Sequence, residues 1–316
     1  MSRFTTSVLL ATALLGVLLW VVISIVVDLA RAPAQPLTMP TVKEIRFFDP
    51  ALPRIANRVQ LINWLDEQGH DGDKLLGSLN AWLEARGYPE RYNWISATGS
   101  KQPEPFINND DAELLLIAGR GDLAAMHELA ERSLITDDPL EALAWYDRAI
   151  VSGSLYAMLR TADLITTLTD PALAEFISNP QWQAALSQLR NESPPPLERA
   201  LGWSFAAINV GGYALMDNAH ARRIKNLQEQ LSPAELESAC QTGQDYLLAA
   251  ASARRALGNA VFTTDRPAAA ITVNEADNII ACDVTVQPLV SLADCSQQTF
   301  VGPGPELMSI WLCAEN

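Results

Sequence analysis

The sequence predicts a mainly α-helical protein in which helical hairpins stack as repeats behind one N-terminal transmembrane helix, with a small β-containing C-terminal tail. Three observations support this fold class. An uncharged apolar tract occupies residues 8–27. Between residues 110 and 257, apolar residues recur at helical spacing and a short pattern repeats. After residue 258 the periodicity changes to the alternation that is typical of strands.

Composition narrows the class of protein. The chain has 316 residues, of which 49% are apolar and 19% are charged, which is ordinary for a folded protein. Its formal net charge of -15 falls on the part that follows the apolar tract, because Arg3 and Asp28 cancel. A surface of that sign repels phosphate backbones. We therefore expect no nucleic-acid partner.

The tract from Val8 to Val27 predicts a membrane anchor. A helix rises about 1.5 Å per residue, so this tract covers the roughly 30 Å hydrocarbon core, and it is apolar on all sides. Arg3 lies on one side of it, while Asp28 and Arg31 cancel on the other. The positive-inside rule then places residues 1–7 in the cytoplasm and the body outside, on the periplasmic side of a bacterial inner membrane.

A cleaved signal peptide is the alternative to an anchor. Ala32-Pro33-Ala34 has the small-x-small form of a cleavage site, and cleavage there would leave a mature chain that begins near Gln35. The apolar tract is longer than the 7–15 residues usual in a signal peptide, which favours the anchor.

Residues 28–56 predict a stiff linker, and residues 57–109 a helical cap region. The linker is rich in proline, which removes backbone donors and favours extended geometry. Helical spacing of leucine and tryptophan then predicts a pair of helices over Arg58–Arg86, joined by a turn at Gly69–Asp73. His70, Asp71 and Asp73 of this turn lack the alternating oxygen ligands and distant Glu of a calcium loop, so we expect no metal there.

Residues 110–257 carry the repeat signal. The pattern Gly121–Met126 returns as Gly153–Met158, which places Ala125 and Ala157 at equivalent positions. Between the copies, Asp138 can cap a helix that has Pro139 at its first position. A weaker copy follows. The positions that define the repeat are Gly121, Ala125, Asp138, Ala142, Trp145, Tyr146, Ala149, Gly153, Ala157, Trp203, Ala207 and Gly211.

This pattern resembles that of the Sel-one-like repeats, a family related to the tetratricopeptide repeats. Units of that family read as a Gly, an Ala-rich first helix, a short loop, and then D-x-x-x-A-x-x-W-Y-x-x-A-x-x-x-G. The stretch Asp138–Gly153 matches this second-helix pattern in register, and the resemblance covers about a third of the chain. It implies hairpins of paired helices, in which Trp145 and Ala149 are buried against a helix that begins near Ser154, and an adaptor role in multiprotein assemblies.

The sequence departs from the family pattern at three places. Leu134–Asp138 replaces the glycine-rich loop before the second helix, and Ser204 stands where the later unit would have its tyrosine. Residues 164–191 do not fit the period and predict extra helices around 173–177 and 182–189. These helices are expected to serve as caps of a short array.

The last part of the chain, residues 258–316, predicts a small sheet behind a long helix. Ser232 and Glu235 form a capping box that opens a helix reaching about Leu257. Strands are expected at residues 269–273, 280–286 and 309–313. The four cysteines all lie late in the chain, and an even count in an exported protein suggests disulfides. We expect at least one bridge among Cys282, Cys295 and Cys313, with Cys240 bonded to the remaining one.

No stretch predicts a catalytic site. Gly202–Ala206 resembles a nucleophile elbow around Ser204, but an elbow needs a strand before the serine, and helical spacing surrounds it here. The three histidines, His70, His127 and His220, are not spaced as metal ligands, and His127 is expected on the exposed side of its helix. Tyr156 and Tyr213 are expected to pack in the core, with a groove lining as the alternative.

The expected function is therefore binding rather than catalysis. We expect a membrane-anchored scaffold or adaptor of the cell envelope, with a protein or peptide partner and without a metal or cofactor. The alternative is an envelope hydrolase or another enzyme, for which a closed pocket with converging polar groups would be the distinguishing feature.

Overall fold

The computed structural model describes residues 51–88, 106, 108–170, 179–212, 218–259, 262, 266–273, 282, 292, 294–302 and 307–313. The stretch from Ala51 to Asn316 forms one compact unit, and Met1–Pro50 is a separate unit. The expected anchor at residues 8–27 lies outside the described residues. Among the helices that are described, none is both long enough and apolar enough to cross a membrane.

The described chain begins with the expected helical pair. Helix α2 spans Arg58–Glu67 and helix α3 spans Gly72–Glu84. Asp71 is the N-cap of α3, because its carboxylate accepts the backbone N–H of Lys74. A side chain on Gly72 would collide with the main chain of Ile62, since an added Cβ would lie 2.8 Å from that carbonyl oxygen. Helix α3 begins at Gly72, so Gly72 and Asp73 belong to the helix and not to the turn that the sequence pattern predicts at Gly69–Asp73.

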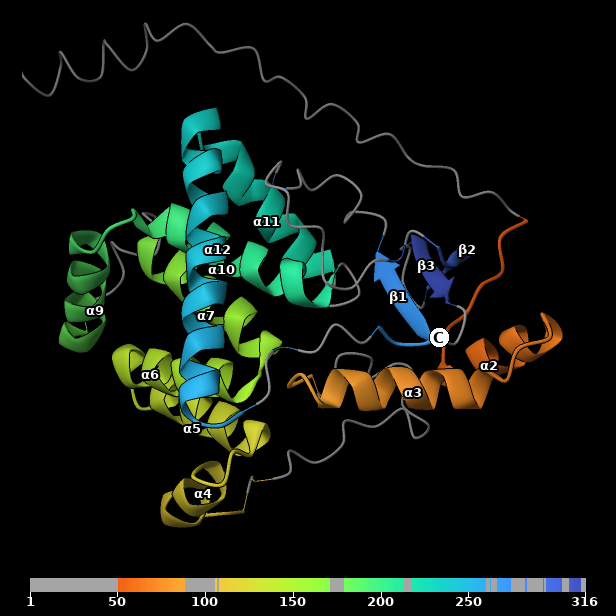
Figure 1. The fold of residues 1–316 in the computed structure, drawn as a ribbon, viewed down its shortest axis with the longest axis horizontal. Helices are drawn as coiled ribbons and strands as arrows, with labels where there is room; N and C mark the ends of the chain where they lie inside the picture. The colour runs from red at the N-terminus through yellow and green to blue at the C-terminus, as the bar shows by residue number, and fades with distance from the viewer. Residues whose placement is uncertain are drawn as a thin grey trace, which may run out of the picture. The chain divides into compact units, whose positions relative to one another are not determined.

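The helical body follows, and Figure 1 shows its helices packed against one another in pairs. Helix α5 packs against α4 and α6, α7 packs against α6 and α10, and α10 packs against α12; α9 lies against α6 and α7. The helices are α4 (Asp111–Ala118), α5 (Leu123–Ile135), α6 (Pro139–Ser152), α7 (Leu155–Thr169), α9 (Pro180–Asn191), α10 (Pro196–Gly211), α11 (Asn218–Gln230) and α12 (Pro233–Ala256).

Short polar side chains fix where these helices begin. In five of them the N-cap side chain accepts the backbone N–H of the residue three positions later, which satisfies one of the donors that a helix start leaves free. Ser232 and Glu235 form the reciprocal capping box that the sequence predicts. The caps of this kind are Asp110, Asp122, Asp138, Ser154 and Ser232.

Two glycines let α10 and α12 approach closely. A Cβ added to Gly243 of α12 would lie 2.7 Å from the carbonyl oxygen of Gly202 in α10. A Cβ added to Gly202 would lie 2.9 Å from the methyl group of Thr242. The contact between the two helices therefore depends on residues without side chains.

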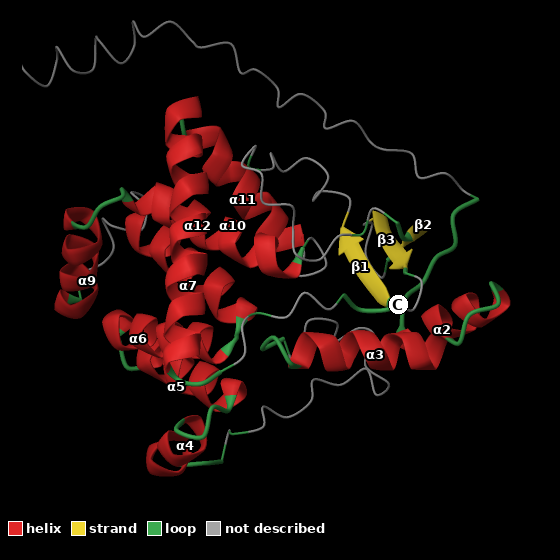
Figure 2. Cartoon of the chain, in the orientation of Figure 1, coloured by secondary structure: helices red, strands yellow, loops and turns green. Residues whose placement is uncertain are grey.

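The C-terminal sheet has three described strands, drawn in yellow in Figure 2. These are β1 (Ala269–Val273), β2 (Ser296–Val301) and β3 (Leu307–Leu312), in the order β1-β3-β2 with both pairs antiparallel. The structure confirms the strands predicted at 269–273 and 309–313, and it adds β2, which was not predicted. The strand expected at 280–286 lies outside the described residues except for Cys282.

Covalent bonds and backbone pairing fasten this sheet to its surroundings. Cys240 of α12 is bonded to Cys282, and Cys295 is bonded to Cys313, which confirms the expected bridging and selects one of the pairings that the sequence leaves open. Ile55 donates its N–H to the carbonyl of Val301 at 2.9 Å, so the segment before α2 pairs with β2. Two disulfides are typical of proteins in oxidising compartments and indicate a location outside the cytoplasm.

Candidate functional site

Most of the repeat positions predicted from sequence are buried. Among them, Tyr146 is 0% exposed. Trp145 is 7% exposed and Ala149 is 0% exposed, which confirms that both are buried. Their helix α6 packs against α5 and α7. The buried repeat positions are Ala125, Ala142, Trp145, Tyr146, Ala149, Ala157, Ala207 and Gly211.

The two copies of the glycine pattern have the same turn geometry. Gly121 and Gly153 both have positive φ, at 91° and 115°, where residues with a side chain are strained. The next residue caps the following helix in each copy: Asp122 accepts the N–H of Ala125, and Ser154 accepts that of Ala157. The turns at Gly121 and Gly153 are therefore alike in the sign of φ and in the cap that begins the next helix.

Gly153 has a second constraint that Gly121 lacks. An added Cβ at Gly153 would lie 2.7 Å from Nη1 of Arg254, whereas nothing lies within 4 Å of the same position at Gly121. Arg254 belongs to the last turn of α12 and donates to the carbonyl of Val151 at 3.0 Å. This cation therefore caps the C-terminus of α6, where the helix dipole favours positive charge.

The later unit is less regular. Trp203 is half-buried and stacks on Tyr246 of α12, with ring centroids 4.2 Å apart. Gly211 is the last residue of α10, and the positive φ falls one residue later, at Gly212. The spacing from Trp203 to Gly211 thus repeats in sequence, but the turn that follows is displaced by one position.

The prediction that His127 is exposed was wrong. Its side chain is buried at 7% exposure, and its Nε2 lies 2.8 Å from the hydroxyl of Ser154. The segment after α3 covers it, because a Cβ added to Gly87 would lie 2.7 Å from the ring. Tyr156 covers another side, with ring centroids 5.0 Å apart. Burial, followed by the charge of Arg160, lowers the pKa of His127 to about 4.

Helix α7 carries a polar stripe that the sequence reasoning missed. Tyr156, Arg160, Asp163 and Thr167 follow one another at helical spacing, so they share a face of the helix. We call these four residues the α7 stripe. The spacing alone could have revealed it, since it is the polar complement of the apolar face formed by Ala157, Leu164 and Leu168.

Charges from the neighbouring helices pair with the α7 stripe. Glu131 of α5 accepts hydrogen bonds from Arg160 Nη2 at 2.7 Å and from the hydroxyl of Tyr146 at 2.6 Å. Asp163 forms an ion pair with Arg223 of α11. The stripe therefore links three helices, α5, α7 and α11, and its charges are fixed relative to one another.

These polar groups are part-exposed and electrostatically coupled. The side chains of Arg160 and Glu131 are 30% and 40% exposed, and that of Asp163 is 12% exposed. Burial works to lower the pKa of Arg160, but Tyr146, Tyr156 and Glu131 outweigh it, so the pKa is raised. Burial also raises the pKa of Tyr146, which keeps its hydroxyl neutral and able to donate.

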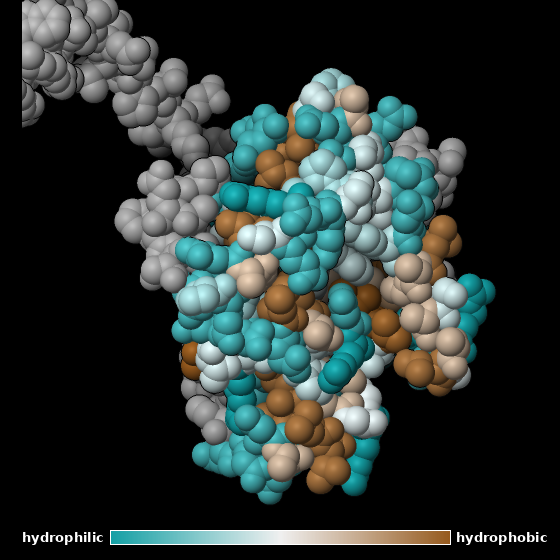
Figure 3. Space-filling model, turned by 90° about the vertical axis from the view of Figure 1, so that its left-hand side faces the viewer, coloured by the Kyte–Doolittle hydropathy of each residue, from teal (hydrophilic) through white to brown (hydrophobic). Residues whose placement is uncertain are grey.

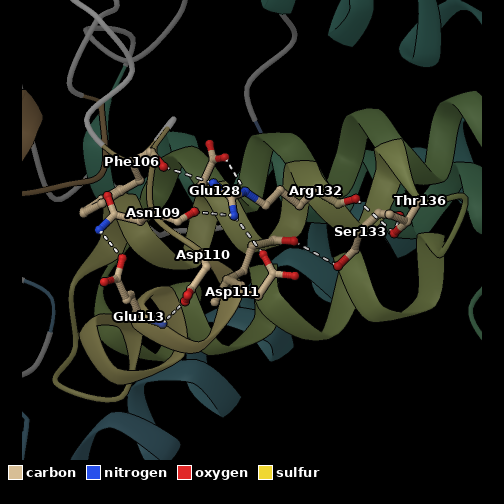
Figure 4. Close-up of polar contacts among 10 residues, drawn as sticks. Phe106, Asn109, Asp110, Asp111, Glu113, Glu128, Arg132, Ser133 and Thr136 are labelled. Atoms are coloured by element: carbon tan, nitrogen blue, oxygen red, sulfur yellow. Dashed lines mark hydrogen bonds and ion pairs between the residues drawn. The ribbon is translucent and has the colours of Figure 1, made fainter.

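A separate arginine fastens the start of the helical body. Figure 4 shows Arg132 of α5 reaching the segment that leads into α4. Its guanidinium donates to Asp111 at 2.8 Å, to the carbonyl of Asn109 at 2.9 Å and to that of Phe106 at 3.0 Å. The hydrogen bonds that Arg132 donates to Asp111 and Glu128 raise the pKa of Arg132. Asp110 of this segment is the N-cap of α4, because its carboxylate accepts the N–H of Glu113.

Two of the residues weighed for catalysis, Ser204 and His220, have partners of their own. Ser204 lies inside α10, and its hydroxyl donates to the carbonyl of Ala200, so the strand-turn-helix of a nucleophile elbow does not surround it. His220 faces Asp163 at 3.7 Å. Within the described ranges, no group of three His, Cys, Asp or Glu side chains is placed to hold a metal ion. Tyr213 lies outside them.

Comparison with known protein families, with curated proteins and with solved structures finds no match for this chain. The resemblance to Sel-one-like repeats therefore remains a prediction from the residues quoted above.

Proposed function

We propose that this protein is a membrane-anchored, exported helical-repeat scaffold that binds a protein or peptide partner along the α7 stripe. The observation that carries the proposal is the recurrence of one turn at Gly121 and Gly153, which begins α5 and α7 in the same way. Repeats of paired helices place their first helices side by side and form an extended binding surface from them.

The α7 stripe suits such a surface because the other sides of α7 are occupied. Helices α6 and α10 pack against it, and its apolar residues, such as Leu164 and Leu168, are buried. The stripe stays part-exposed, and its ion pairs to α5 and α11 hold the side chains in place before a partner arrives. A preordered surface loses less conformational entropy on binding.

The proposed location outside the cytoplasm has two supports. The apolar tract at residues 8–27 is long enough to anchor the chain, and the two disulfides are typical of an oxidising compartment. A reporter that is active only outside the cytoplasm should be active when fused after Asn316. Activity of a cytoplasmic reporter at the same position would contradict the proposed orientation.

Site-specific photo-crosslinking in intact cells tests the binding surface. Thr167 is the exposed end of the α7 stripe, and Leu248 of α12 is an exposed position away from it. A photoreactive residue at Thr167 should yield a discrete crosslinked partner that the same residue at Leu248 does not. Arg160→Gln should reduce that crosslink. Equal crosslinking from both positions, or none from Thr167, would count against the proposal.

A further inference from the structure

Helix α4 exposes apolar side chains that a helix of a soluble body normally covers. Residues Leu114 to Ala118 are five consecutive apolar residues, but the structure buries only Leu114 and Ala118. Leu115 is 49% exposed and Leu116 is 68% exposed. Figure 3 shows hydrophobic surface at the lower end of the face that it draws, the end at which α4 lies in Figure 1. Neighbouring large apolar side chains that stay exposed on one helix often mark an interaction surface.

An acid lies near the start of the exposed side of α4, and a base follows in the turn after the helix ends. Glu113 and Leu116 lie at i and i+3 in α4, and Arg120 lies two residues beyond Ala118, where its N–H donates to the carbonyl of Ile117 at 3.0 Å. We call these three residues the α4 stripe, in which the leucine lies between an acid and a base along the chain. The carboxylate of Glu113 accepts a hydrogen bond from Asn109 at 3.0 Å. Arg120 is exposed, and its guanidinium has no ion pair or hydrogen bond in the described part of the chain.

We propose that this stripe is a twofold interface with a second copy of the chain. In an antiparallel pair of α4 helices related by a twofold axis, Leu116 packs near its own copy at the centre. Glu113 of each chain then faces Arg120 of the other, so the contact forms two ion pairs. The helix dipoles also run in opposite directions in this arrangement, which is favourable. An interface of this kind is closed by its symmetry and forms a dimer rather than a filament.

The interface is small, which sets its strength. Two helices of eight residues bury much less than the roughly 1,200 Å² at which stable interfaces begin, so the dimer forms reversibly and depends on concentration. An ion pair at the rim contributes mainly to orientation and partner choice. The proposal is independent of the binding surface on α7, because the stripe of α4 shares no residue with it.

The central leucine gives the first test, by sedimentation equilibrium of the full chain in density-matched detergent over a range of concentrations. Leu116→Lys should weaken self-association by at least about tenfold, because it places a charge at the centre of the contact. Leu248→Lys is the matched control: Leu248 is 67% exposed and lies on α12. It should leave self-association unchanged.

The charged ends give a second test that separates this pairing from other dimers. Arg120→Glu alone and Glu113→Arg alone should each weaken the dimer, because each places like charges opposite one another. The chain with both substitutions should dimerise again, since both ion pairs are restored in reverse. An equimolar mixture of the two single variants should also form a heterodimer, for the same reason.

Several outcomes would overturn the proposal. A wild-type chain that stays monomeric throughout would remove it, and so would a dimer that Leu116→Lys leaves intact. Loss of the dimer in Leu248→Lys to the same degree would point to a different contact. Failure of the double charge reversal to restore association, in a variant with a native circular dichroism spectrum, would refute the antiparallel arrangement.

Discussion

Replacing Gly153 by alanine tests two constraints on this residue: the positive φ of its turn, and the close contact with Arg254 at the end of α12. Gly153 has a φ of 115°, and an added Cβ would lie 2.7 Å from Nη1 of Arg254. The substitution therefore strains the backbone of the turn. It also displaces the guanidinium of Arg254, a residue that is only 9% exposed. Gly121 has a similar φ, at 91°, and open space around it.

The magnitude follows from these two contributions. Alanine in a left-handed conformation costs about 1–2 kcal/mol, which is the full effect expected for Gly121→Ala. Gly153→Ala adds the loss of the hydrogen bond from Arg254 to the carbonyl of Val151, a bond of 3.0 Å from a charged donor. Such bonds contribute about 1.5–3 kcal/mol. We expect Gly153→Ala to cost about 2.5–5 kcal/mol in total.

Urea unfolding of the full chain in mild detergent, followed by tryptophan fluorescence, measures both costs. In a double-substitution cycle with Arg254→Met, the cost of Gly153→Ala should fall to that of Gly121→Ala, because the clash and the hydrogen bond are both gone. Equal costs for the two glycines in the wild-type background would refute the reasoning. A cost at Gly153 that Arg254→Met does not change would place the strain elsewhere.

Three further predictions concern the core, the buried histidine and the disulfides. Trp145→Ala should lower the free energy of unfolding by about 3–5 kcal/mol, since the ring is 7% exposed; thermal unfolding without a shift would remove the repeat-core assignment. The pKa of His127 is lowered from 6.5 to about 4 in the folded chain. As the pH falls from about 6.5 to about 4, the imidazole is therefore protonated in the unfolded chain before it is protonated in the folded one. The free energy of unfolding should fall across this pH range by up to about 3 kcal/mol. His127→Gln should flatten that part of the pH profile, and an unchanged profile would argue against a buried neutral ring. Non-reducing mass spectrometry should find no free thiol, and replacing Cys240 and Cys282 together by serine should cost about 4 kcal/mol in the chain-entropy view of a crosslink 42 residues apart.

Local signals account for the parts of the fold that the sequence predicted correctly. An N-cap needs only one short polar side chain and the backbone N–H three residues later, so Asp138 and Ser232 could be assigned from a few letters. Burial of Trp145 and Ala149 followed from helical spacing. Strand β2 was missed because its residues, from Ser296 to Val301, include two glutamines and lack a clear apolar alternation. Its place in the sheet comes from pairing with β3 instead.

His127 was placed on the wrong side for a reason that spacing cannot reveal. Its neighbours along α5 are Met126 and Glu128, which leave its face undecided. The burial of His127 comes from the segment after α3, because Gly87 of that segment lies against the ring. The same segment also pairs with the start of α7, where the carbonyl of Arg86 accepts the N–H of Leu155 at 3.1 Å. A backbone contact between segments so far apart in sequence leaves no periodic pattern in either one.

Gly121 and Gly153 have similar turns but different surroundings. The same turn and the same cap recur at both, so the pattern is a property of a few neighbouring residues. The environment of Gly153 is set by Arg254, which reaches Val151 across 103 residues of chain. An uncharged side chain in place of Arg254 would leave the sequence pattern intact and still change the stability of the turn. The regularity of the repeat thus predicts the hairpins, while the contacts that distinguish one unit from the next come from the helix that packs back on them.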